Sequence, residues 1–374
     1  MAGLVLIAAG LYALALLVRP ALDPDLAAGP AVRGTPLRSV VSRIAALGGG
    51  WGAGFLLAAP YLFPFVEYAR TGARMVSRIA GAEERPPVGL AALPQLLDPS
   101  FYGSAREGLI YFAQGNHLES PAAAFAGIVL TLVAVPWAWR SRRHRGIGVV
   151  LAILAFIGLS WVLAVPGLLE LWRLPWLRPF SHNRFVFLFA FAIAALAAIG
   201  LDSLRTAGRP SWRWCLPQAL APLAFGALAL ARSLEPPRAL TQISERIPAG
   251  TPRHHLIDTP QEMAAILANA STQSAQTAVV CLLATALLLV AARTRRRWVP
   301  TAIGAAAALE LLAFGFGYAP DADERLAFPP VPALEGIPPG DRTVGLNCLP
   351  PNLHRRFGLH DLRGYDGVDP ALLI

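Results

Sequence analysis

The sequence contains no lysine, so all 32 of its basic residues are arginines. We interpret this absence as codon bias in a GC-rich genome, because physical chemistry rarely excludes lysine altogether. Charged residues make up only 15% of the chain, against about 25% in an ordinary soluble domain. Three cysteines are too few for a disulfide framework, and we interpret all three as free thiols without a redox role.

Several catalytic signatures are also missing. The chain has no phosphate-cradling glycine loop, no Ser-x-x-Lys motif and no zinc-binding helix motif, so cytosolic nucleotide chemistry is unsupported. The net charge of +9 and the pI near 10.3 are compatible with nucleic-acid binding. The arginines, however, cluster in short turns between apolar runs, which is what membrane topology requires. The predicted partners are therefore membrane lipids, and no nucleic acid.

Long apolar runs dominate what is present. Hydrophobic residues make up 55% of the chain, and the mean hydropathy is +0.51. A membrane-spanning helix needs about 20 mostly apolar residues. Eight runs come close to this length: 2–18, 44–66, 122–139, 146–165, 185–204, 216–231, 275–292 and 298–318. The sequence thus predicts an all-α polytopic membrane protein of about eight transmembrane helices.

The runs differ in strength. The run 44–66 carries no charge over its whole length, whereas 216–231 is short and contains Pro217 and Pro222. The first run has no basic segment before it, and no small-residue cleavage site follows it. A transmembrane helix is therefore a better interpretation than a signal peptide.

Arginine-rich loops predict the orientation, because short cytoplasmic loops carry an excess of basic residues. The loops that follow the first, third, fifth and seventh runs are basic, including "RSRRHR" at 140–145 and "RTRRRW" at 293–298. We therefore expect them in the cytoplasm of a bacterium, with the chain in its cytoplasmic (inner) membrane. The extracytoplasmic segments are then 67–121, 166–184, 232–274 and 319–374.

The two ends of the chain lead to a further expectation. With this orientation Met1 lies outside, with almost nothing before the first helix. Residues 319–374 are expected to be the start of an extracytoplasmic soluble region, which stops within "DLRGYDGVDPALLI". We expect the chain to be an internal fragment of a longer protein, with at least one more span upstream.

Several stretches, taken in order, resemble the YfhO family of bacterial membrane proteins, which is related to the GT-C glycosyltransferases. They are "LAAPYLFPFVEYARTGAR" at 57–74, "LLDPSFYGSAREGLIYFAQGNHLESPAAAFAGIVLTL" at 96–132, "LPWLRPFSHNRFVFLFAFAIAALAAIGLDSL" at 174–204, "ALELLAFGFGY" at 308–318 and "RTVGLNCLPPNLHRRFGLHDLRGYDGVDP" at 342–370. The resemblance implies transfer of sugar from a polyprenyl-phosphate carrier at the outer face. It also implies a catalytic acid in an outer loop upstream of this chain, so no catalytic residue is assigned.

The segment "LRPFSHNRF" places two arginines, a histidine and an asparagine at the mouth of the fifth run. Arg178 and Arg184 are candidates to bind a donor phosphate, because a guanidinium donates two parallel hydrogen bonds to such an anion. The alternative is that both arginines extend to lipid headgroups and fix the helix end. His182 and Asn183 are candidates for substrate binding, or for ordinary residues at a helix entrance. Trp172 and Trp176 are expected to be interface aromatics.

Two further candidate groups are polar. Glu310 is the only acid well inside a run, so we expect it to face the protein interior. It is a candidate ligand, or it pairs with an arginine of another helix or remains protonated. Asn116, His117 and Glu119 form a polar cluster together with Tyr102.

This cluster is a candidate site for a sugar acceptor, or part of a helix cap built on Ser120 and Pro121. Two possible ligands, His117 and Glu119, are a weak metal signal, so no metal or other cofactor is predicted.

The sequence therefore favours a GT-C-like membrane glycosyltransferase that acts on a cell-envelope glycan or teichoic acid. A transporter or flippase of lipid-linked sugars is the main alternative, although transporters usually show internal repeats. A non-catalytic envelope scaffold is a third possibility.

Overall fold

The computed structural model describes most of the apolar runs. Its described residues are 10, 36–71, 73–82, 84, 86–104, 109–110, 122–175, 177–178, 180–206, 212–238, 240–241, 260–294, 298–316, 330–343 and 356–361. The chain divides into two compact units, which are described separately. The first comprises Met1–Gly34, Arg85–Trp172 and Ser181–Tyr318, and the second comprises Thr35–Glu84, Arg173–Phe180 and Ala319–Ile374.

Helix dominates these residues, as the sequence predicts. Among the described residues, five helices are long and apolar enough to cross a membrane. They are α3 (Pro36–Thr71), α9 (Val186–Thr206), α10 (Trp212–Leu234), α12 (Pro260–Arg293) and α13 (Trp298–Gly315). At a rise of about 1.5 Å per residue, even 18 residues extend about 27 Å, close to the thickness of the hydrocarbon core. A multi-pass membrane protein is thus supported by the lengths and the composition of these helices.

Strands are minimal among the described residues. Strand β1 (Gly103–Ser104) pairs with β2 (Leu109–Ile110) in antiparallel fashion, and β3 (Arg342–Thr343) pairs with β4 (His360–Asp361) in parallel. The remaining short elements are helical: α4 (Ala73–Ala80), η1 (Gly89–Leu96), α8 (Leu168–Trp172), η4 (His182–Phe185) and α15 (Pro332–Glu335).

Two of the expected spans are shorter than the sequence predicts. In place of a helix over 122–139, helical structure begins near Ile128 with a π-helical segment, η3 (Val129–Ala134), and continues into α6 (Val135–Ala138). In place of 146–165, α7 covers Arg145–Ser160. Conversely, α10 is a continuous 23-residue helix despite Pro217 and Pro222. The expected first span, 2–18, lies almost entirely outside the described residues.

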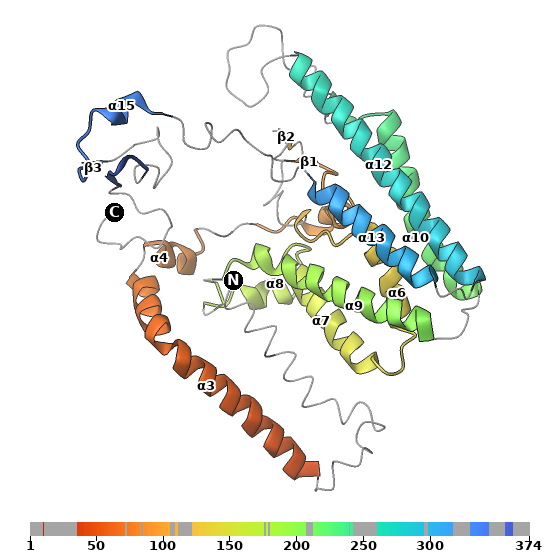
Figure 1. Cartoon of the computed structure of the whole chain (residues 1–374), viewed down its shortest axis with the longest axis horizontal. Helices are drawn as coiled ribbons and strands as arrows, with labels where there is room; N and C mark the ends of the chain where they lie inside the picture. Colours follow the sequence, from red (N-terminus) through yellow and green to blue (C-terminus); the bar gives the residue numbers. More distant parts are fainter. Residues whose placement is uncertain are drawn as a thin grey trace. The chain divides into compact units, whose positions relative to one another are not determined.

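The short π-helical segment η3 is central to the first unit. It contacts four of the long helices, α9, α10, α12 and α13. Its side chains Val129 and Val133, together with Trp137 of α6, are buried against residues of these helices such as Leu288 and Ile303. Figure 1 shows α12 alongside α10, and α7 against α9, in agreement with the residue contacts.

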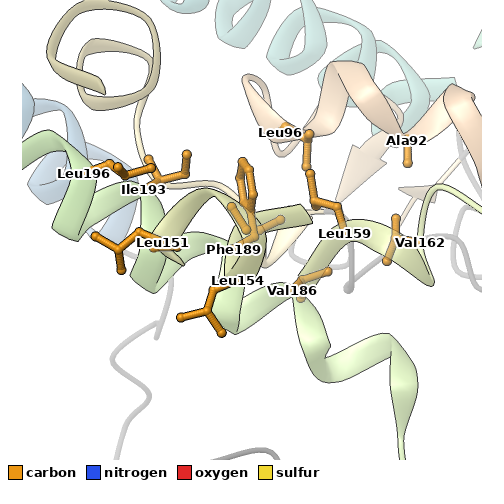
Figure 2. Close-up of a cluster of buried hydrophobic side chains, with 14 of the residues drawn as sticks. Ala92, Leu96, Leu151, Leu154, Leu159, Val162, Val186, Phe189, Ile193 and Leu196 are labelled. Carbon is orange, nitrogen blue, oxygen red and sulfur yellow. The ribbon is translucent and has the colours of Figure 1, made fainter. Parts of the chain in front are cut away.

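A second apolar cluster joins α7 to α9. Figure 2 shows Leu151, Leu154 and Leu159 of α7 close to Val186, Phe189, Ile193 and Leu196 of α9. Ala92 and Leu96 of η1 pack on the same cluster, as does Val162. The amides of Val88 and Gly89 donate to the carbonyl of Val162, at 3.2 and 2.8 Å. The start of η1 is thereby fixed to the residues that follow α7.

Small residues let these helices approach closely, as is common between helices in membranes. A Cβ added at Gly158 of α7 would lie 2.7 Å from the amide nitrogen of Phe189. At Gly200 of α9, a Cβ would overlap the carbonyl oxygen of Ala134. Only glycine fits at these two crossings, so they fix the spacing of α9 from α7 and from η3.

Candidate functional site

The entrance to α9 is built on a buried aromatic group. His182, only 6% exposed, lies beside Trp161 at a ring-centroid distance of 4.5 Å, and beside Phe185 at 5.5 Å. Trp172 also contacts His182, and its Nε1 donates a hydrogen bond to the Ser160 hydroxyl oxygen at 2.8 Å. We call Trp161, Trp172, His182 and Phe185 the aromatic group.

One expectation about this entrance changes as a result, and one open alternative gains support. Trp172 was expected to be an interface aromatic, yet it is buried, and Ser160 at the end of α7 accepts its indole N–H. Trp176 lies outside the described residues. His182 is enclosed by rings, which favours packing at a helix entrance over direct contact with a substrate.

Arg184 projects away from the aromatic group. The 3₁₀ geometry of η4 places His182 and Phe185 on the same side, since residues three apart are eclipsed. Arg184 falls between them and is exposed, whereas Asn183 is half-buried. The backbone amide of Arg184 donates to the Ser181 carbonyl, but the Arg184 guanidinium has no hydrogen bond or ion pair within the described part of the chain. Arg184 thus lies next to the buried aromatic group, and the N–H donors of its guanidinium are available to a ligand.

Arg178 belongs to the second unit and has a structural contact there. Its Nη1 donates to the carbonyl of Ile79 at 3.3 Å, near the C-terminal end of α4. A guanidinium in this place interacts favourably with the negative end of a helix. This contact differs from both roles expected from the sequence, because it joins Arg178 to the end of α4 and not to the end of α9.

The side chain of Glu310 accepts hydrogen bonds from two backbone amides. Its Oε1 accepts a hydrogen bond from the amide of Ile128 at 2.5 Å, and its Oε2 accepts one from Val129 at 3.0 Å. The sequence left open a pairing with an arginine of another helix, but the carboxylate instead caps the N-terminus of η3. Gly127 adopts φ +93°, and a Cβ there would lie 3.3 Å from Glu310 Oε2. The close approach of the carboxylate therefore also depends on this glycine.

Two inward-facing polar residues were missed by the sequence interpretation. Gln95 is 1% exposed, and neither polar atom of its side-chain amide has a hydrogen-bond partner among the residues that the structure describes. Asp98 is 5% exposed, and its Oδ1 accepts the amide of Ser100 at 3.1 Å. The signal was a pair of polar residues three apart in the apolar stretch "GLAALPQLLDP". Buried amides without partners are rare, and each of them requires an explanation.

Asp98 and Glu310 lie in the same region of the first unit. Both carboxylates are close enough to act electrostatically on Cys281 of α12. Cys281 is fully buried within the core around η3. Two acids from segments far apart in sequence thus lie within electrostatic range of the same buried position on α12.

A third group surrounds Arg232 near the end of α10. Its Nη2 donates to the carbonyl of Phe101 at 2.6 Å, and the guanidinium carbon lies 3.8 Å from the centroid of the Phe101 ring. The Tyr102 hydroxyl donates to the carbonyl of Ala91 at 2.8 Å. Burial raises the pKa of Tyr102, and Arg232 offsets part of this effect. Tyr102 therefore remains a neutral hydrogen-bond donor.

The rest of the predicted acceptor cluster, Asn116, His117 and Glu119, lies outside the described residues, as does its alternative cap of Ser120 and Pro121. No group of three or more His, Cys, Asp or Glu side chains that could hold a metal occurs among the residues described. Glu310 and Arg184 share no hydrogen bond or ion pair within that part of the chain.

Comparisons with profiles of known protein families, with curated proteins and with solved structures find no match to this chain. Function must therefore be argued from the residues themselves. Two features could take part in binding or catalysis. They are the exposed Arg184 beside the aromatic group, and the acids Glu310 and Asp98.

Proposed function

We propose that this chain is part of a GT-C-like membrane glycosyltransferase that binds a polyprenyl-phosphate-linked sugar at the extracytoplasmic end of its helices. The observation that carries the proposal is the exposed guanidinium of Arg184, which has no partner among the described residues. The resemblance of 174–204 to the YfhO family supports the same assignment.

The chemistry of a lipid-linked donor suits this position. With the predicted orientation, α9 runs inward from the outer face, so Arg184 lies near the level of the lipid headgroups. A guanidinium donates two parallel charge-assisted hydrogen bonds to a phosphate, and the positive end of the α9 dipole adds attraction. During transfer, the oxygen of an acceptor hydroxyl bonds to the anomeric carbon, its proton passes to the carboxylate that the family resemblance implies upstream of this chain, and the bond from that carbon to the phosphate oxygen breaks. Arg184 stabilises the negative charge left on the polyprenyl phosphate.

Replacement of Arg184 tests this role. Arg184→Lys keeps the charge but loses the paired hydrogen bonds, and Arg184→Gln loses both. We expect either variant to transfer labelled sugar at least about tenfold more slowly, since a hydrogen bond to a charged group contributes about 1.5–3 kcal/mol. The assay uses the full-length protein in liposomes, including the upstream segment expected to carry the catalytic acid, with the amount of inserted protein measured in parallel.

Arg238 provides a matched control, because it is also exposed and lies in another predicted extracytoplasmic segment, 232–274. Arg238→Lys should transfer sugar at the wild-type rate. Wild-type transfer by Arg184→Lys would remove Arg184 from the donor site and leave it as an anchor for the helix end.

Translocation of a lipid-linked sugar is a second candidate, and one observation favours it. Transporters commonly contain interrupted helices whose N-termini lie inside the protein and face anionic groups. Here the helical segment that starts at Ile128 begins inside the first unit, and its first amides bind the carboxylate of Glu310. Movement of labelled lipid-linked sugar across the bilayer without transfer to an acceptor would favour this alternative.

A further inference from the structure

The short helix α4 is strongly amphipathic. At 100° per residue, positions 75, 76, 79 and 80 fall on one face and positions 74, 77 and 78 on the other. The first face holds Met, Val, Ile and Ala, and the second holds Arg, Ser and Arg. Val76 and Ile79 are 63% and 47% exposed, so the described part of the chain leaves this apolar face uncovered.

Contacts within the second unit fix the end of this helix. An isolated helix of eight residues is not stable in water. Gly81, at φ +83°, donates to the carbonyl of Arg78, and Ala82 donates to that of Ser77, which together form a Schellman cap. Arg178 donates to the Ile79 carbonyl, as described above. The apolar face is therefore presented on a helix whose C-terminal end is fixed.

The next segment is also held in place. Glu84 lies two residues after the Schellman cap, and Arg173 binds its carboxylate through Nε and Nη2, with the shortest contact at 2.6 Å. This ion pair joins the segment after α4 to the segment that contains Arg178. The exposed apolar face thus belongs to an ordered part of the second unit.

The place of α4 in the chain identifies what covers this face. The candidate span Ile44–Glu67 in α3 ends six residues before α4 begins, so α4 starts close to a membrane boundary. Arginines occur at positions 70, 74 and 78, at intervals of four, and α4 itself contains no acid. Basic residues next to a span attract anionic lipids, and an apolar face inserts between the headgroups.

We propose that α4 lies in the plane of the bilayer surface, with Val76 and Ile79 among the lipid headgroups and Ser77 on the water side, and that the positive charge of its arginines attracts anionic phospholipid. The partner is the membrane surface next to the span in α3. This inference depends on the multi-pass topology and not on sugar transfer.

Site-specific fluorescence in the full chain tests the proposal. In a Cys348→Ser background, an environment-sensitive dye is attached at Val76→Cys or, as the matched control, at Ser77→Cys on the opposite face. The buried Cys215 and Cys281 remain, and the background itself should take up no dye. The protein is reconstituted into vesicles of phosphatidylcholine with or without phosphatidylglycerol.

The dye at position 76 should be quenched by shallow spin-labelled lipids and protected from aqueous iodide, and the dye at position 77 should show the reverse. The lipid quenching at position 76 should be stronger with phosphatidylglycerol. The double change Arg74→Gln/Arg78→Gln should abolish that increase, while Arg74→Lys/Arg78→Lys should keep it.

Three results would overturn the proposal. Equal iodide quenching at both positions would place α4 in water. Protection of position 76 from iodide and from lipid quenchers alike would show that protein covers the face. Lipid quenching that is the same in both kinds of vesicle would exclude recognition of anionic headgroups.

Discussion

Removal of the Glu310 carboxylate should destabilise the first unit in graded steps. Glu310→Leu leaves the amides of Ile128 and Val129 without their acceptors in the core around η3. A buried donor that loses its partner costs about 1–3 kcal/mol, so two donors cost about 2–6 kcal/mol of the free energy of unfolding. Glu310→Gln keeps one acceptor oxygen and the side-chain shape, so it should cost about half as much.

Thermal unfolding of the full chain in detergent micelles, followed by tryptophan fluorescence, measures this loss. At about 2 °C for each kcal/mol, Glu310→Leu should lower the melting temperature by about 4–12 °C. Hydrogen exchange provides a local measurement, because the amides of Ile128 and Val129 should exchange faster in both variants.

The matched control is Glu235→Gln, since Glu235 is exposed just beyond the end of α10. It should melt within about 1 °C of the wild type, as most surface substitutions do. If Glu310→Leu also melted within 1 °C and its amides kept their protection, the carboxylate would not be what holds the start of η3.

Two further predictions concern helix packing. Gly200→Ala forces a Cβ against the Ala134 carbonyl and should lower the free energy of unfolding by about 1–3 kcal/mol, whereas Gly148→Ala, where the nearest atom lies 4.0 Å away, should be nearly neutral in the same melting assay. Trp172→Phe removes the hydrogen bond to Ser160 and should cost about 0.5–1.5 kcal/mol; a melting temperature equal to that of the wild type would show that this bond does not stabilise the aromatic group.

The long helices could be predicted from sequence because their signal is local. An uninterrupted apolar run is enough to indicate α9 or α13, and the structure agrees closely with both. The run 216–231 looked weak because of Pro217 and Pro222, yet α10 is continuous. Proline is tolerated in transmembrane helices, because neighbouring helices and local adjustments satisfy the carbonyls that it leaves free.

The polar contacts of Glu310 could not be predicted in the same way, because they join distant parts of the chain. Glu310 caps a helix that starts 182 residues earlier, and nothing near position 128 indicates a carboxylate partner. The conformation of Gly127 and this cap explain why the expected span 122–139 becomes helical only near Ile128. Composition likewise did not show that Gln95 and Asp98 face inward.

Cysteine accessibility tests the central claim most directly, namely that the long helices cross a membrane with their arginine-rich ends in the cytoplasm. Cysteine is introduced at Ser141 or Thr294, beside the basic loops, and at Gln261, which is exposed near the start of α12. In intact cells, an impermeant thiol reagent should label Gln261→Cys but label Ser141→Cys and Thr294→Cys only after the membrane is permeabilised. Labelling of Ser141→Cys in intact cells, with Gln261→Cys protected, would reverse the orientation and place Arg184 on the cytoplasmic side. Equal labelling of all three positions in intact cells would contradict the membrane-spanning arrangement itself.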